Sequence, residues 1–293
     1  MASMCALSTS CAAQETDQAI VPHPQTYSVS YIGNDTGAPD GSGKLATEQQ
    51  IEVCGRIGDA QVSAGSANGE FAVARFYDQE TQMAAYKFCK GGTMSPIQFT
   101  NDVGRLTGSA FTTNTGGLFM VTYHNNTFKT LEIATGELIE GQLMDISADG
   151  SFQLLAKIDE DRGREYPFVR TLNNDGSYLV FDISLSDDQG RQSFVSNCMN
   201  DNGMVLGQSY VRDENGVSLD DRRRTKLAIW TAETGHVLLE DISTPGTLPP
   251  GYYEQLDFEK VRTSRRFCTL DNDGSIVARD HETRAYLSFK PIR

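Results

Sequence analysis

The sequence lacks long apolar runs and carries a deficit of positive charge. No segment reaches the roughly 18 consecutive apolar residues of a membrane-spanning helix, so we expect no membrane span. Lysine and arginine number 25 against 39 aspartates and glutamates, which gives a net charge of −14 over 293 residues. A surface this acidic repels phosphate backbones and anionic lipid headgroups. Nucleic acid and membrane surfaces are therefore not expected as partners.

The usual sequence signatures of catalysis are also missing. The chain has no Gly-x-Ser-x-Gly, no nucleotide-binding glycine loop and no His-Glu-x-x-His. Its four histidines are scattered, and no two cysteines have the short spacing of a zinc site. No stretch shows a capped apolar pattern of 3.6-residue period, so we expect almost no long helix.

What the sequence does have is a recurrent turn phrase. A short cluster of Asn and Asp ends in glycine and precedes an alternating apolar run. Asn and Asp bond their own main chain and tolerate left-handed backbone angles, which glycine adopts without steric cost. Each copy therefore predicts a tight turn that enters a strand. The copies are residues 101–104, 147–150, 173–176, 200–203 and 271–274, with a weaker copy at 67–69.

A second phrase lies between these turns. Residues 128–138 and 228–238 are each an apolar strand that ends in Thr-Gly and restarts with an apolar pair, which predicts a second hairpin. Turn, strand, loop, strand, Thr-Gly turn and strand make a unit of roughly 40 to 50 residues, the size of a four-stranded propeller blade. The longer spacing from Gly203 to Gly274 predicts either an insertion near 244–251 or one further blade.

These repeats predict an all-β chain with a single β-propeller of five or six four-stranded blades, seven being the upper limit. The propeller would occupy residues 25–293, after a leader and N-terminal segment at 1–24. Ring closure would place the first strand, near Tyr27, beside the last, near Tyr286, so that no sheet edge is left exposed at the junction.

Part of the chain resembles known repeats. Residues 200–242 are similar to the HAF repeat of bacterial extracellular proteins, with Lys226–Trp230 (KLAIW) where that family has HAFLW. Residues 147–152 are similar to the Ser-Pro-Asp-Gly phrase of Tol-type periplasmic propellers, with Ala148 in place of proline. The resemblance implies a secreted or periplasmic propeller and supplies no catalytic residue, because these motifs build the scaffold.

The N-terminus favours export. Residues 1–13 are small or apolar and uncharged, and an acidic, proline-containing stretch follows. This pattern resembles the end of a secretory signal peptide, with either a cleavage site at 11–13 or a degraded lipobox that would make Cys11 a lipoprotein anchor. The alternative is an unstructured leader. We expect a periplasmic, cell-surface or extracellular protein.

Cysteine usage agrees with export. If Cys5 and Cys11 belong to the leader, an even set of four remains that allows three pairings. We favour Cys54 with Cys89 and Cys198 with Cys268, because each pair would tie neighbouring repeats. The alternative is four buried free thiols in a cytosolic protein.

Two groups of residues are candidates for ligand binding. Basic side chains cluster at Arg222, Arg223 and Arg224 with Lys226 nearby, and at Arg265 and Arg266 with Arg262 nearby. They could clamp an anion by bidentate pairing, or lie in a solvated loop balanced by acidic neighbours. The Asp-rich turns could alternatively bind calcium, but 271–274 has only two carboxylates before its glycine, so turn chemistry is preferred. We expect no other cofactor.

The sequence is compatible with two functions. The first is a non-catalytic, monomeric binding module for a protein or glycan ligand, favoured because the signal consists of scaffold repeats. The alternative is a propeller glycosidase or lyase that acts on an anionic sugar through carboxylates and the arginine clusters. A pocket with two facing carboxylates near an arginine would favour the enzyme.

Overall fold

In a computed structural model of the chain, twenty strands and one short helix are described. The described residues are 26–34, 61–66, 68–78, 83–98, 105–159, 164–184, 194–210, 225–244, 248, 256–257, 270–280 and 285–292. The helix, α2 (Leu239–Ile242), has only four residues. Within these ranges the prediction of almost no helix is confirmed.

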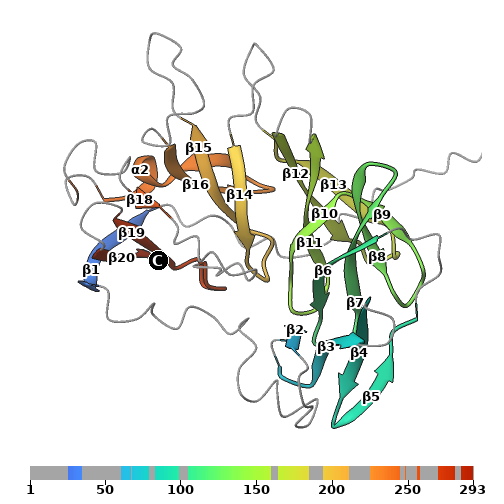
Figure 1. The fold of residues 1–293 in the computed structure, drawn as a ribbon. Coiled ribbons are helices and arrows are strands. Elements are labelled where there is room, and N and C mark those ends of the chain that lie inside the picture. The colour runs from blue at the N-terminus through green and yellow to red at the C-terminus, as the bar shows by residue number, and fades with distance from the viewer. Residues whose placement is uncertain are drawn as a thin grey trace, which may run out of the picture.

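The strands form five four-stranded antiparallel sheets, each a meander of consecutive strands apart from the last (Figure 1). We call these sheets blades 1 to 5. Blade 1 comprises β2 (Gln61–Gly65), β3 (Phe71–Asp78), β4 (Met83–Lys90) and β5 (Thr93–Pro96). Blade 2 comprises β6 (Arg105–Thr112), β7 (Leu118–His124), β8 (Thr127–Glu132) and β9 (Leu138–Glu140).

The remaining blades follow the same plan. Blade 3 comprises β10 (Gln142–Ile146), β11 (Phe152–Asp159), β12 (Arg164–Leu172) and β13 (Tyr178–Asp182). Blade 4 comprises β14 (Phe194–Met199), β15 (Val205–Tyr210), β16 (Thr225–Thr231) and β17 (Gly235–Leu238). Blade 5 comprises β18 (Leu256–Asp257), β19 (Ile276–Asp280), β20 (Ala285–Pro291) and the N-terminal strand β1 (Tyr27–Asn34).

The first and last strands meet in blade 5. Strand β1 pairs antiparallel with β20, so that Tyr27 lies opposite Pro291 and Gly33 opposite Tyr286. The fully buried Tyr27 also donates its hydroxyl hydrogen to the Gly274 carbonyl at 3.0 Å. The predicted pairing of the first and last strands is confirmed.

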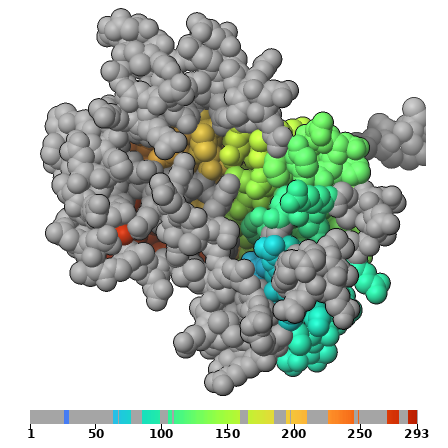
Figure 2. Space-filling view, in the orientation of Figure 1, coloured from blue at the N-terminus to red at the C-terminus, as the bar shows by residue number. Residues whose placement is uncertain are grey.

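Successive blades pack face to face through apolar layers. Val73 and Tyr86 of blade 1 pack with Met120 of blade 2. Further layers join blade 2 to blade 3, blade 3 to blade 4 and blade 4 to blade 5. The space-filling view shows blades 1 to 3, coloured cyan to green, lying against one another (Figure 2). The fold is therefore a β-propeller of four-stranded blades, as predicted, with five blades among the described residues.

A β-bulge recurs in the first strand of four blades. The register with the second strand shifts between Val62 and Ala64 in β2, between Leu143 and Asp145 in β10, and between Ser196 and Cys198 in β14, and a longer shift interrupts β6. Bulges increase the local twist and redirect side chains. In β10 the bulge precedes Asp145, a buried residue that bonds to the next blade.

The long interval between Gly203 and Gly274 holds the rest of blade 4, α2 and β18, and no further sheet among its described residues. The phrase at 101–104 lies outside the described residues, and the first turn of blade 2 is instead formed by 113–117. Residues 1–24 also lie outside them. No described helix is long and apolar enough to cross a membrane.

Candidate functional site

The turn between the first and second strands contains the same glycine hydrogen bond in every blade. Its glycine N–H donates to the carbonyl three residues earlier at 3.0 or 3.1 Å. The five glycines have φ between +71° and +86°, a region that other residues adopt only with strain. The loop has three residues in blades 2, 4 and 5, where for example the Thr113 N–H donates to the Gly117 carbonyl, and four in blades 1 and 3, where the Ser66 N–H donates to the Phe71 carbonyl. The glycines are Gly69, Gly116, Gly150, Gly203 and Gly274.

Polar side chains of these turns accept hydrogen bonds from groups of the same turn. The Asp149 carboxylate accepts the Ser151 N–H at 2.9 Å and the hydroxyls of Ser147 and Ser151 at 2.7 Å each. Asn200 Oδ1 accepts the N–H of Met204 at 3.0 Å. This local bonding is the reason that Asn, Asp and Ser recur in the phrase.

The same turns are hydrogen-bonded from blade to blade. The Asn68 N–H donates to Asn114 Oδ1 at 2.8 Å, and the Asn114 N–H donates to the Ala148 carbonyl at 2.6 Å. The Ala148 N–H in turn donates to the Asp201 carboxylate. Asp201 and Asn272 bond reciprocally, at 2.9 and 2.8 Å. A series of hydrogen bonds thus links the first turns of blades 1 to 5, and we call these five turns the turn series.

A second polar contact joins blades 3 and 4 below these turns. The Asp145 carboxylate, on a residue only 6% exposed, accepts the N–H of Ile146 at 2.9 Å and that of Met199 in β14 at 3.0 Å. An anionic acceptor buried in this way needs such donors, because a buried carboxylate without partners is costly. Asp145 therefore stabilises the seam between the two blades.

The surroundings of two aspartates in the turn series change their pKa values in opposite directions. Partial burial would raise the pKa of Asp149, but the hydrogen bonds from Ser147 and Ser151 to its carboxylate lower it below the usual value. The pKa of Asp271 is raised, first by burial and then by the neighbouring charge of Asp273. The described residues contain no group of three or more His, Cys, Asp or Glu side chains placed to hold a metal ion.

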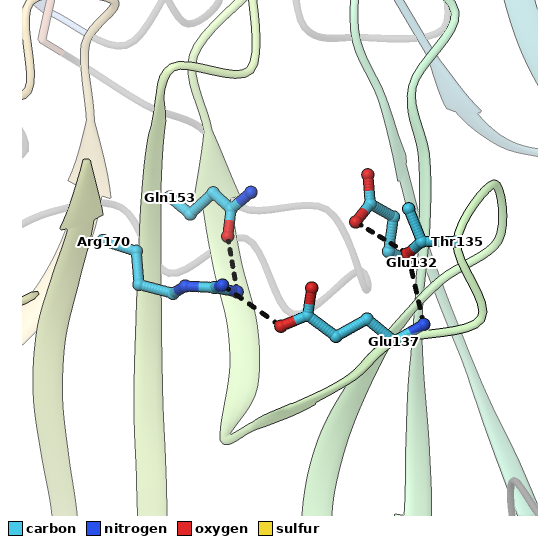
Figure 3. A network of polar contacts seen from close by, with 5 residues as sticks. All are labelled: Glu132, Thr135, Glu137, Gln153 and Arg170. Carbon is cyan, nitrogen blue, oxygen red and sulfur yellow. Dashed lines mark hydrogen bonds and ion pairs between the residues drawn. The ribbon is translucent and has the colours of Figure 1, made fainter. Parts of the chain in front are cut away.

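A separate polar cluster spans the seam between blades 2 and 3 (Figure 3). Arg170 of β12 points across the seam, and its guanidinium bonds Glu137 at 3.2 Å and Gln153 Oε1 at 3.5 Å. Its Cζ lies 3.7 Å from the ring centroid of Tyr178 in β13, a cation–π distance. The four residues, together with Glu132, form what we call the Arg170 cluster.

The cluster is organised by neighbouring strands and one turn. Arg170 lies directly opposite Gln153 in the register of β11 and β12. Glu137 follows the β8–β9 turn, where its N–H donates to Thr135 Oγ1 and the Thr135 hydroxyl donates to Glu132 at 3.0 Å. Burial raises the pKa of Tyr178, Arg170 opposes that effect, and the two glutamates add to it.

The Arg170 cluster contains an arginine near two carboxylates, the composition expected of the alternative, enzymatic function. Its guanidinium is already occupied by Glu137, Gln153 and the Tyr178 ring. The Arg170 side chain is only 11% exposed, whereas that of Glu137 is 49% exposed. The cluster as it stands is an inter-blade ion pair rather than an open anion site.

One half-buried histidine lies at the seam between blades 3 and 4. The His236 ring packs edge-on against Phe194, with the ring centroids 4.5 Å apart, and it bonds the backbone of Ile183. Its Nδ1 atom is buried without a hydrogen-bond partner among the described residues. Burial lowers the pKa of this histidine, which favours the neutral ring.

The predicted basic site falls outside what the structure describes. Arg222, Arg223, Arg224, Arg265 and Arg266 are all in undescribed ranges, as are Cys54 and Cys268. Lys226 is described, and its ammonium group pairs with the Glu240 carboxylate of α2. Cys89 of β4 and Cys198 of β14 are both buried.

The sequence did not predict the Arg170 cluster. Its residues come from a hairpin turn and four strands, and although Glu132 and Glu137 lie in the second recurrent phrase at 128–138, that phrase predicted only a hairpin. Only the strand alternation that places Gln153, Arg170 and Val180 in one cross-strand row could have indicated it.

Comparison with known proteins finds similarity of fold alone. No family model matches the chain, and no curated protein matches it. The β-propeller domain of the Trilobed protease from Pyrococcus furiosus is 14% identical, with a TM-score of 0.39, over 63% of this chain and 59% of that one. A gluconolactonase from Xanthomonas campestris is 10% identical, with a TM-score of 0.37, over 79% and 71%. A dihydro-heme d1 dehydrogenase is 12% identical, with a TM-score of 0.29, over 71% and 51%.

Proposed function

We propose that this chain is a non-catalytic, exported β-propeller that binds a protein or glycan ligand as a monomer. The observation that carries the proposal is the turn series. The side chains that recur in the sequence bond their own turn or the turn of the next blade. The repeated motif is thus used for assembly, which leaves function to the surfaces that the blades present.

The positions of two turn phrases support the resemblance to the repeats of exported proteins. The phrase similar to the HAF repeat forms the β14–β15 turn, and Lys226–Trp230 lies in the third strand of that blade. The phrase similar to Tol-type propellers forms the β10–β11 turn. We therefore propose secretion or periplasmic location, with residues 1–24 as the leader.

Two disulfides belong to this proposal: Cys54 with Cys89, and Cys198 with Cys268. Cys89 and Cys198 are 0% and 1% exposed, and neither sulfur is free. Each pair would tie its blade to a neighbouring segment and restrict the unfolded chain. An oxidising compartment is the setting in which such bonds persist.

A propeller glycosidase or lyase is the second candidate, and the Arg170 cluster is the observation that favours it. Glu132 and Glu137 both lie across the seam from Arg170, and Glu137 pairs with its guanidinium (Figure 3). A ligand carboxylate would have to displace Glu137 from the guanidinium. If the chain cleaves uronic-acid polysaccharides, Glu137→Gln should reduce turnover by more than about 100-fold, the scale of general acid–base catalysis.

The test is a pair of assays on the full chain. Binding is measured on an array of neutral and acidic glycans and against candidate polypeptides by surface plasmon resonance. Turnover is measured by reducing-end release and by absorbance of unsaturated products from uronic-acid polysaccharides. The proposal expects saturable binding without turnover. Turnover that depends on Glu137 would contradict it and favour the enzyme.

A further inference from the structure

In each blade we call one end strand of the sheet, which is β5, β9, β13, β17 or β1, its outer strand. The edge formed by the outer strand of blade 3 differs from the corresponding edges of the other blades. Strand β13 pairs with β12 on one side only, and no described strand pairs with its other side. Two of the three apolar residues at its centre, Leu179 and Val180, are exposed, at 49% and 56%. They are adjacent, so they project from opposite faces of the sheet.

The register shows which backbone groups point outward. The Ile183 N–H donates to the Pro167 carbonyl of β12, and the Ser177 carbonyl accepts the Asn173 N–H. Odd-numbered residues of this strand therefore direct their backbone groups toward β12. Because these groups alternate along a strand, the N–H and C=O of Tyr178, Val180 and Asp182 point to the outer edge.

The other outer strands have features that prevent pairing with another chain, and β13 lacks these features. Strand β5 ends in Pro96, β9 has three residues and β17 runs directly into α2. Strand β1 carries a register shift between Tyr31 and Gly33. Short strands, prolines and bulges prevent an edge from pairing with another chain. Strand β13 has five residues, no proline and no register shift.

Charge at the two ends of the strand is negative. Asp175 lies in the turn before β13 and Asp182 at its end, and both are exposed. Within the described part of the chain, each carboxylate bonds only the nearby serine, Ser177 or Ser184. The half-exposed Glu137 lies beside Arg170 on the same seam. An extended apolar edge is thus bracketed by carboxylates.

We propose that β13 is a strand-addition site for an extended segment of another polypeptide with apolar residues at its centre and lysine or arginine at both ends. Main-chain pairing with Tyr178, Val180 and Asp182 would supply affinity, and Leu179 and Val180 would select apolar side chains. The basic ends would meet Asp175 and Asp182. The inference rests on the proposed function in its protein-binding form.

A second copy of this chain fits the edge less well. Each copy carries a net charge of −14, and β13 contributes no cationic side chain. Two such edges would therefore bring like charges together, which disfavours association. The guanidinium of Arg170, which stacks on Tyr178 of this strand, is already paired with Glu137.

The test uses the full chain and a fluorescent nine-residue probe of alternating valine and threonine with two lysines at each end. Two control probes carry N-methylated valines or glutamates in place of the lysines. The double variant Leu179→Lys, Val180→Lys keeps the pairing with β12, and Met94→Lys is the matched control because Met94 is an exposed apolar residue in another blade. Circular dichroism and unfolding midpoints verify that the variants fold.

The lysine probe should bind the natural chain saturably. Its affinity should fall at least about tenfold when its valines are N-methylated, when its lysines are replaced by glutamates, or when the double variant is the partner. Binding to Met94→Lys should be unchanged. Equal binding of the N-methylated probe, no binding of the lysine probe, or unchanged binding in the double variant would overturn the inference. A dimer in sedimentation that the double variant abolishes would overturn it in favour of self-association. If the lysine probe fails these tests while array ligands still bind the natural chain, only this site is wrong; turnover without binding would instead refute the proposed function.

Discussion

Asp201 and Asn272 lie 71 positions apart and hydrogen-bond each other in both directions. The Asp201 N–H donates to Asn272 Oδ1, and Asn272 Nδ2 donates to the Asp201 carboxylate. The other carboxylate oxygen of Asp201 accepts the Ala148 N–H of the preceding blade. One side chain therefore holds the first turns of three consecutive blades together.

Replacing Asp201 should cost more stability than replacing an aspartate of the same turn type that touches no other blade. Asp175 is the matched control, because its carboxylate bonds only Ser177 among the described residues. We expect Asp201→Ala to reduce the free energy of unfolding by about 1–3 kcal/mol, since it leaves donors on both sides unpaired. Asp175→Ala should cost less. Equal losses in urea unfolding would contradict an inter-blade role.

Two glycines separate backbone strain from close packing. Gly203 and Gly176 both have positive φ, +76° and +83°, but a Cβ on Gly203 would lie 2.6 Å from the Phe152 ring, whereas one on Gly176 would contact nothing. Both alanine variants should lose about 1–2 kcal/mol to the left-handed backbone. Gly203→Ala should lose about 1–3 kcal/mol more because Phe152 must move. Equal midpoints in thermal unfolding would show that the ring does not constrain this turn.

Much of the fold follows from local sequence chemistry. The Thr-Gly hairpins at 133–137 and 232–235 and the Asp-Gly turns were predictable because each depends on a few adjacent residues. The pairing of β1 with β20 is long-range, and it was predictable only because a repeat architecture has to close its ring. The first turn of blade 2 was not, since Asn114, Thr115 and Gly116 lack the aspartate of the phrase. The weak copy at 67–69 proved a full member of the turn series.

The candidate sites were harder to predict than the fold. The Arg170 cluster depends on the register of three strands and on a turn from the neighbouring blade, and sequence spacing contains neither. The exposed edge at Leu179 and Val180 has the sequence of an ordinary buried strand. Exposure there depends on which strand is outermost in its blade, which only the assembled sheet determines.

Protonation of His236 should weaken the seam between blades 3 and 4. Burial holds its pKa below the unfolded value, so the folded state binds fewer protons than the unfolded state. Stability contributed by the neutral ring is complete above an unfolded pKa of about 6.5 and falls as pH decreases through and below it. The variant His236→Gln should show a smaller loss of stability than the natural chain between about pH 7 and 5. Parallel curves for the two proteins in urea unfolding would show that His236 does not set this pH dependence.

The proposed disulfides can be tested by alkylation and mass spectrometry. Under non-reducing denaturation, Cys54, Cys89, Cys198 and Cys268 should resist alkylation, and each should become modified after reduction. Peptide mapping should recover Cys54 linked to Cys89 and Cys198 linked to Cys268. Complete alkylation without reductant would contradict the bridges, and crossed links would contradict the pairing.

The central claim, that the recurrent turn phrase couples one blade to the next, is tested most directly by a double-mutant cycle between Asp201 and Asn272. Free energies of unfolding are measured for the natural chain, Asp201→Ala, Asn272→Ala and the double variant. The bond from Asn272 Nδ2 to the Asp201 carboxylate, which either single substitution removes, predicts a coupling energy of about 1 kcal/mol or more. Losses that add to within about 0.3 kcal/mol would show that the two turns do not stabilise each other.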